Sequence, residues 1–160
     1  PSSGLHTNGF SLVRRVFHLD ETPAVLFRYH DELQHQLGEE LLVRHRCYYP
    51  LLKPVLGLVK GLAHITGGGL PGKIPAILPH TVVASLQRGS WPVPPIFSII
   101  QREGVVSVEE MYRVFNMGLG MVAVCSESNV ADIQAAAPEA RVVGRIVPRE
   151  GEEQVLFRDG

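Results

Sequence analysis

The chain has 160 residues, of which 45% are hydrophobic and 19% are charged, and its formal net charge is −1. This length suits one domain that buries roughly two-thirds of the surface of its unfolded chain, and the composition is that of an ordinary globular protein. The lack of a basic block argues against nucleic-acid binding through a charged face. No apolar run reaches the ~18 residues that a membrane span needs.

The first half of the chain predicts helices around one short strand. The start, Pro1-Ser2-Ser3-Gly4, is small, polar and linker-like and lacks an initiator Met, which predicts a fragment cut at a domain boundary. Apolar residues at helical spacing predict a helix over 10–17. Residues 31–46 lack a clean period and fit a helix or a loop. A helix over 50–59, with Pro54 in its first turn, and a strand over 60–65 are expected next.

The middle of the chain carries clear start signals for helices. Residues 74–78 predict a short helix and 81–86 a strand. Pro94-Pro95 can start a helix that ends near Gly104. Ser107 and Glu110 have the spacing of a capping box, which predicts a further helix from Ser107 onward.

The last quarter alternates between strands and a helix. The apolar run 121–125 is typical of a strand covered on both faces. A helix is expected over 127–137, and strands over 141–147 and 154–157. Such alternation of helices and strands predicts an α/β or α+β sandwich.

The cysteines and most histidines show no pattern of a functional site. Cys47 and Cys125 lie far apart among apolar neighbours; one disulfide is arithmetically possible, but two isolated, buried thiols of a cytosolic protein fit better. Five histidines without ligand spacing are expected at the surface: His18, His30, His35, His45 and His80.

The most informative segment is the glycine-rich loop His64-Ile65-Thr66-Gly67-Gly68-Gly69. Glycines allow close backbone approach and positive φ, and a loop that leads into a helix can direct several N–H groups at a phosphate. Gly67-x-x-x-x-Gly72-Lys73 also matches most of a P-loop, but Ile74 stands where that motif needs a hydroxyl for magnesium. A plain strand-to-helix turn remains open as an alternative.

Two further segments allow either a binding or a structural role. In 4–11, Asn8-Gly9 is a turn signal, and Asn8 or Ser11 could cap the following helix or bind a ligand. In 115–121, Gly118 and Gly120 suit a helix C-cap and a tight turn, and Asn116 could also reach a ligand.

Together these segments resemble the C-terminal domain of the phosphoribosylformylglycinamidine cyclo-ligases, also called aminoimidazole ribonucleotide synthetases. The resemblance spans nearly the whole chain. It rests on 4–14 (GLHTNGFSLVR), 63–70 (AHITGGGL), Ile74-Pro75, Leu78-Pro79, 91–94 (WPVP) and 110–121 (EMYRVFNMGLGM).

The resemblance implies the α+β class with a three-layer α/β/α sandwich. It makes 1–160 a single substrate-binding domain that follows an N-terminal ATP-binding domain absent from this chain. The full enzyme would use ATP to activate the formyl oxygen of formylglycinamidine ribonucleotide, which the amidine nitrogen then displaces, closing the imidazole ring of aminoimidazole ribonucleotide in purine biosynthesis.

The same resemblance assigns roles to individual residues. His64 is expected near the reacting centre as the catalytic residue. The expected substrate or phosphate contacts are Asn8, Ser11, Thr66, Gly67, Gly68, Gly69 and Asn116. ATP and magnesium are the expected cofactors, held mainly by the N-terminal domain, so the isolated domain should be inactive and holds no metal of its own. A cytoplasmic homodimer is expected for the full-length protein.

The sequence departs from the family pattern at two places. Gly72, Lys73 and Ala76 stand where the family often has an acidic residue, Asn and Arg, so the far end of the loop is expected to contact its ligand differently. His45 replaces the Thr of a usual Thr-Arg-Ile-Tyr, which leaves the role of this position open.

Two other function classes remain open from the sequence. Related two-domain ATP enzymes make selenophosphate, phosphorylate thiamine phosphate or dehydrate a carbamoyl group, although the glycine loop and 115–121 favour the purine branch. A non-catalytic binding or assembly module is the third possibility.

Overall fold

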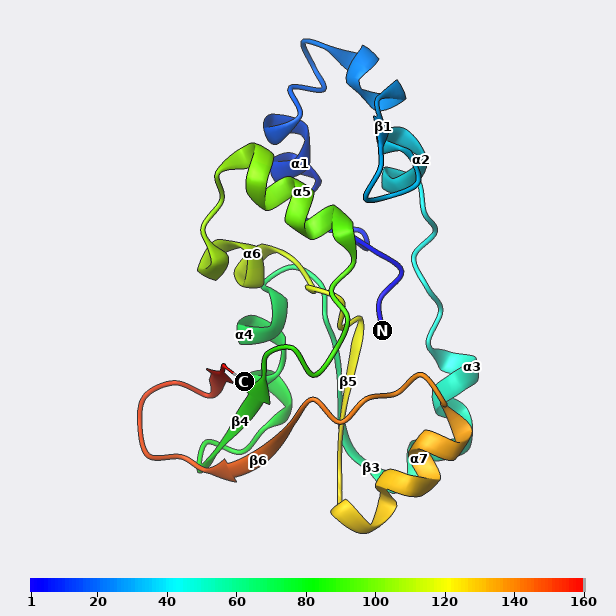
Figure 1. Ribbon diagram of the computed structural model, residues 1–160. Helices are drawn as coiled ribbons and strands as arrows, with labels where there is room; N and C mark the ends of the chain where they lie inside the picture. Colours follow the sequence, from blue (N-terminus) through cyan, green and yellow to red (C-terminus); the bar gives the residue numbers. More distant parts are fainter. Residues whose placement is uncertain (160) are drawn as a thin grey trace.

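The computed structural model describes residues 1–159 and shows an α+β fold, with short helices packed around small sheets (Figure 1). The α-helices are α1 (Phe10–Val16), α2 (Leu37–Leu41), α3 (Tyr49–Leu52), α4 (Gly69–Lys73), α5 (Pro95–Gly104), α6 (Val108–Val114) and α7 (Val130–Ala136). The 3-10 helices are η1 (Pro23–Phe27), η2 (Lys53–Leu58), η3 (Pro75–Ile77) and η4 (Glu127–Asn129). The strands are β1 (Tyr29–His30), β2 (His35–Gln36), β3 (Val59–His64), β4 (Val82–Gln87), β5 (Met121–Cys125), β6 (Gly144–Pro148) and β7 (Val155–Arg158).

The strands form two antiparallel pairs and one three-stranded sheet. β1 pairs with β2, and β3 pairs with β5 so that Leu62 lies opposite Ala123 and His64 opposite Met121. In the third sheet β4 is central, antiparallel to β6 and parallel to β7. The pairing of β3 with β5 brings the glycine loop, which follows β3, next to the segment that precedes β5.

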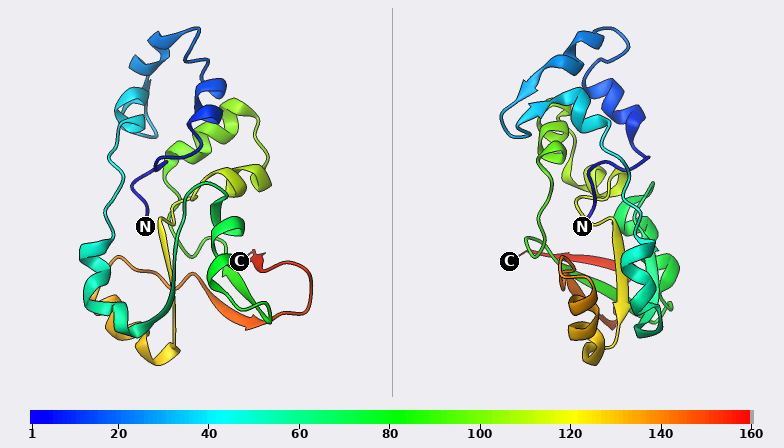
Figure 2. Two further views of the ribbon diagram at one scale, coloured as in Figure 1. Left: turned by 180° about the vertical axis from the view of Figure 1, so that it is seen from behind. Right: turned by 90° about the vertical axis from the view of Figure 1, so that its right-hand side faces the viewer.

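Helix α5 provides much of the hydrophobic core. Its residues Ile96, Phe97, Ile99 and Ile100 have no exposed surface, and the Phe97 ring lies 5.7 Å from the Phe115 ring between centroids. In Figure 1, α5 lies beside α1 in the upper part of the molecule, while α3 and α7 both lie to the right of the β3–β5 pair in the lower part. The two further views show the N-terminal segment running close to the upper end of β5 (Figure 2), where the Ser2 amide donates to the Gly118 carbonyl (2.8 Å).

Most predicted elements are confirmed near their expected bounds. The helix expected from Ser107 is α6, and the Ser107 hydroxyl accepts a hydrogen bond from the Glu110 amide at 3.2 Å. The carboxylate of Glu110 accepts from Arg113. The helix expected over 50–59 is divided into α3 and η2, which places Pro54 at the start of η2, where its missing N–H costs nothing.

Other predictions needed correction. β5 is not covered on both faces: four of its residues are half-buried and Ala123 is exposed. The strand expected over 141–147 begins later, at Gly144. Cys47 and Cys125 are free thiols as expected, but Cys47 is exposed and Cys125 is half-buried, so neither is a buried core thiol.

Within residues 1–159, every helix is too short or too polar to cross a lipid bilayer.

Candidate functional site

Strand β3 delivers the glycine loop to one end of the β3–β5 pair. The Ile65 amide donates to the Gly120 carbonyl (3.0 Å), and the Ile65 side chain is fully buried, which fixes the start of the loop. Its neighbour His64 has an exposed side chain, and Thr66 is half-buried. The loop therefore leaves the core directly after Ile65 and presents residues 66–68 near the surface.

The three loop glycines differ in what a side chain would meet. A Cβ on Gly69 would lie 1.8 Å from the carbonyl oxygen of Tyr112 in α6, and Gly69 has φ +58°, so only glycine fits this contact. Gly68 has φ +95°, which also strains any side chain, but a Cβ there would have only the Cα of Gly72 near it, at 3.6 Å. Gly67 is exposed, and a Cβ there would meet only the Cβ of Asn8, at 3.9 Å. Gly69 thus serves packing, whereas Gly67 and Gly68 are open to a ligand.

The loop leaves several backbone donors free, among them two adjacent ones at Gly67 and Gly68. The Gly69 amide donates to the Thr66 carbonyl (2.9 Å) and the Gly72 amide to Gly68 (3.0 Å). Within the described part of the chain, the amides of Gly67 and Gly68 donate to no carbonyl. An anion at this loop can therefore be met by two adjacent N–H groups.

Asn8 lies beside this loop, and the oxygen of its side-chain amide forms no hydrogen bond within residues 1–159. Its Nδ2 donates to the Val114 carbonyl (2.6 Å), which fixes the side chain. Among residues 1–159, no group donates to its buried Oδ1. Because a buried acceptor without a partner is costly, Asn8 is well suited to accept a hydrogen bond from a ligand hydroxyl or N–H.

The other two predicted contacts lie in different surroundings. Ser11 is exposed in the first turn of α1. Asn116 is completely buried: its Nδ2 donates to the Gly4 carbonyl (2.7 Å) and its Oδ1 accepts from the Gly118 amide (2.9 Å). These bonds connect the segment 4–11 to the segment 115–121. Asn116 therefore has a structural role, with or without a ligand contact.

Three histidines from separate segments meet next to the loop. His45 and His64 place their Nε2 atoms 2.9 Å apart, and the His6 ring stacks on His45 with centroids at 3.9 Å. The expectation of a surface position is wrong for His30, which is buried, and holds only in part for His45, which is half-buried within this cluster. These three histidines have no ligand spacing in the sequence, because their side chains meet only through long-range packing. The one hint of the cluster in the sequence is the departure from the family pattern at position 45.

Burial keeps two of these rings uncharged near neutral pH. Burial first, and then the nearby His45, lower the pKa of His6 to about 4. The pKa of His64 is also lowered, first by partial burial and then by His45 and Lys73. A neutral His64 ring can accept a proton, and the nearby positive charge of Lys73 favours an anion at the loop.

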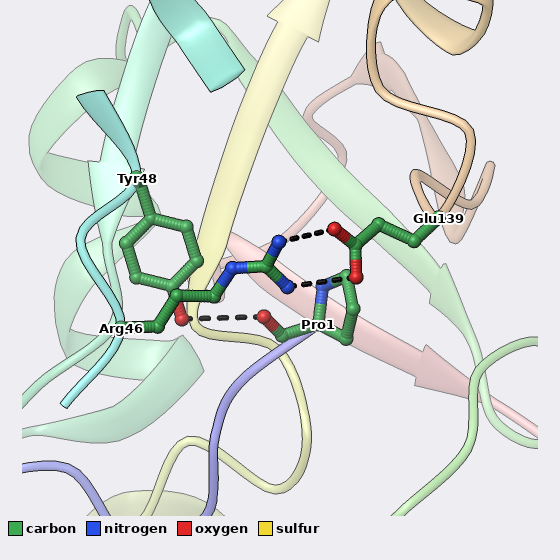
Figure 3. Close-up of polar contacts among 4 residues, drawn as sticks. All are labelled: Pro1, Arg46, Tyr48 and Glu139. Carbon is green, nitrogen blue, oxygen red and sulfur yellow. Dashed lines mark hydrogen bonds and ion pairs between the residues drawn. The ribbon is translucent and has the colours of Figure 1, made fainter. Parts of the chain in front are cut away.

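Tyr48 and Arg46 support the cluster from the segment before α3 (Figure 3). The Tyr48 hydroxyl lies 3.0 Å from His6 Nε2 and 3.2 Å from the Pro1 carbonyl, and burial raises the Tyr48 pKa to about 12. Arg46 forms a two-point ion pair with Glu139, which follows α7. Because its pKa is raised, the Tyr48 phenol stays neutral at pH 7 and supports His6 through a hydrogen bond.

Comparison with known proteins gives consistent results along the chain. Residues 1–156 match the family described as "AIR synthase related protein, C-terminal domain". Proteins named phosphoribosylformylglycinamidine cyclo-ligase from Enterococcus faecalis and Caldicellulosiruptor bescii are 44% and 45% identical over 99% and 98% of this chain, and 47% of each relative is covered. One from Bacillus subtilis is 43% identical over 94% of the chain and 45% of the relative. The chain thus spans about half the length of the curated relatives it matches, and it belongs to the family of AIR synthase related C-terminal domains.

Proposed function

We propose that this chain is the C-terminal half of an ATP-dependent cyclo-ligase that converts formylglycinamidine ribonucleotide to aminoimidazole ribonucleotide in purine biosynthesis. The family match and the names of the relatives support this reaction. The observation in the structure that supports it is the pair of free amides at Gly67 and Gly68, which lie beside Asn8 and follow His64 in the loop.

The loop would hold the phosphate end of the nucleotide. The amides of Gly67 and Gly68, with the Thr66 hydroxyl, would donate to the ribose 5-phosphate, and the Lys73 charge would favour it. Asn8 would accept a hydrogen bond from a substrate donor through its free Oδ1. Contacts from Ser11, Gly69 and Asn116 remain part of the proposal, although the Gly69 amide and the Asn116 side chain already bond within the chain.

His64 would act at the reacting centre. Its side chain is exposed at the loop, and its lowered pKa leaves the ring able to take a proton at neutral pH. Ring closure requires the attacking amidine nitrogen to lose a proton, so we assign His64 as the acceptor of that proton.

The residues of the glycine loop suit a nucleotide phosphate better than they suit a magnesium ion. The free loop amides could contact a nucleotide phosphate. Magnesium prefers oxygen ligands, whereas 64–74 contains no carboxylate and has Ile74 at the position of the P-loop hydroxyl. We therefore assign magnesium and most of the ATP contacts to the N-terminal domain expected to precede this one, and no step here depends on them.

The finer structural expectations belong to the same proposal. The three-layer α/β/α arrangement, the single substrate-binding domain over 1–160, the homodimer and the cytoplasmic location would all apply to the two-domain protein.

Turnover of the two-domain protein tests the proposed reaction. Purified protein that carries this chain should form aminoimidazole ribonucleotide from formylglycinamidine ribonucleotide only when ATP is present, and the 160-residue chain alone should form none. His64→Ala should lower kcat by about 100-fold or more if His64 moves the proton, while His80→Ala, at an exposed and distant histidine, serves as the control. A folded two-domain protein without this turnover would rule out the proposed reaction, and normal turnover of His64→Ala would rule out the role of His64.

A further inference from the structure

The histidine cluster has the composition of a transition-metal site. His6 precedes α1, His45 precedes α3 and His64 ends β3, and one ring nitrogen from each lies within 4.8 Å of the other two. Imidazole nitrogen is a favoured ligand of zinc, copper and nickel, whereas magnesium and calcium prefer oxygen. The cluster therefore differs in chemistry from the magnesium site expected in the N-terminal domain.

The ring geometry leaves lone pairs available. The Nε2 atoms of His45 and His64 are 2.9 Å apart, so only one of them can carry a hydrogen between the rings, and the other must offer a lone pair. Loss of that shared hydrogen would leave both atoms directed at the same point. A single cation between the rings would satisfy both nitrogens.

His6 is oriented in the manner of a supported metal ligand. Its Nδ1 lies 3.2 Å from the Ile65 carbonyl, which can only accept, so this bond requires the hydrogen on Nδ1. The other ring nitrogen, Nε2, then carries the lone pair and accepts a hydrogen bond from the Tyr48 hydroxyl (3.0 Å). If a metal took this lone pair, the Tyr48 hydroxyl could donate to the Pro1 carbonyl instead. Metal-binding histidines commonly donate their other ring N–H to a carbonyl, which fixes the ring and its tautomer.

We propose that His6, His45 and His64 bind one divalent transition-metal ion of the zinc type, with an open fourth position. A tetrahedral zinc with Zn–N bonds of about 2.0–2.1 Å holds its nitrogens about 3.3 Å apart. The His45–His64 pair would open by a few tenths of an ångström and the widest pair would close. The His45 ring would also turn out of its stack on His6 (15° between the ring planes), because each imidazole binds a metal in its own plane. The half-exposed His45 and the exposed His64 can make these movements around the buried His6.

The histidine at position 45 separates the proposed metal site from the proposed cyclo-ligase reaction. The family pattern that the sequence resembles usually has Thr there, which would leave only two of the three ligands. The inference does not rest on the cyclo-ligase activity, and binding can be measured on the chain alone. A His64 ring that binds the metal has no lone pair left for the substrate proton, so the metal-bound form would lack the proton acceptor proposed above.

Titration of the metal-free 160-residue chain with Co²⁺ and Zn²⁺ tests the site. Co²⁺ should give the visible absorption of a tetrahedral nitrogen site and saturate at one equivalent, and Zn²⁺ should displace it. His45→Thr should weaken binding at least about tenfold, since removing a ligand costs no less than removing its hydrogen-bond support. His80→Ala, which removes an exposed histidine elsewhere, should bind like the unaltered chain, and circular dichroism should show the same fold in all variants.

The other outcomes would overturn the proposal. No cobalt absorption in the unaltered chain, or equal affinity in His45→Thr, would show that the three rings only bond to one another. Loss of binding in Cys47→Ser, together with a sulfur-to-cobalt charge-transfer band, would assign the metal to the exposed thiol two residues from His45 and would equally contradict a three-histidine site.

Discussion

The guanidinium of Arg46 forms a two-point ion pair with the carboxylate of Glu139, 93 positions further along the chain. The pair joins the segment before α3 to the turn after α7, directly beside Tyr48 and Pro1 (Figure 3). It thereby helps to hold the segment that carries His45 against the body of the domain. Its strength is limited, because the side chains of Arg46 and Glu139 are 27% and 43% exposed.

Removing this ion pair should cost little stability, and the cost should depend on pH. Arg46 lowers the pKa of Glu139 below its ordinary value of 4.5, so the folded state favours the carboxylate. The contribution is then complete above pH 4.5 and is lost as pH falls through the lowered pKa of the folded state. Glu139→Gln should reduce the free energy of unfolding by up to about 1 kcal/mol at pH 7. Urea unfolding at pH 7 and pH 3 should show this difference shrinking at the lower pH; an equal difference at both would contradict the ion-pair explanation.

Asn116→Ala should be far more damaging than an ordinary asparagine substitution. The change leaves the Gly4 carbonyl and the Gly118 amide without partners in a buried site, which we expect to cost about 2–4 kcal/mol. Asn129→Ala is the control, because it removes one partly buried bond to the Leu58 carbonyl and should cost about 1 kcal/mol. Urea midpoints of the two variants give the comparison. Similar losses in both would mean that the link between 4–11 and 115–121 is not a major source of stability.

Gly69→Ala should destabilise the domain, whereas Gly72→Ala should not. The added methyl at position 69 would overlap the Tyr112 carbonyl and occupy a residue with φ +58°; we expect a loss of about 2–4 kcal/mol from overpacking and backbone strain. A methyl at position 72 meets nothing within 4 Å and lies in α4, where alanine is favoured. Thermal unfolding distinguishes the two variants, and a Gly69→Ala protein as stable as Gly72→Ala would show that the loop can move away from α6.

The sequence predicted elements with local signals and missed features that depend on long-range contacts. Pro94-Pro95 and Ser107 fix the starts of α5 and α6 through their own backbone and side-chain chemistry. The end of β3 and the glycine loop were likewise predicted from apolar and glycine patterns.

Distant contacts account for what the sequence could not show. The meeting of His6, His45 and His64 depends on three elements that come together only in the folded chain. The buried bonds of Asn116 and the packing of Gly69 against Tyr112 are invisible in local spacing for the same reason. A glycine triplet can thus be recognised from sequence, but which glycine faces a ligand and which faces a helix cannot.

The affinity of the two-domain protein for formylglycinamidine ribonucleotide, measured for matched glycine variants, tests the loop most directly. Gly67→Val would place a branched side chain over the two free amides, at a position with open space around it. Gly151→Val adds the same side chain at another open position, between β6 and β7, and serves as the control. Losing one charge-assisted hydrogen bond costs about 1.5–3 kcal/mol, so Gly67→Val should raise the Kd at least about tenfold while Gly151→Val leaves it nearly unchanged. An unaltered Kd in folded Gly67→Val would contradict the claim that this loop binds the phosphate of the substrate.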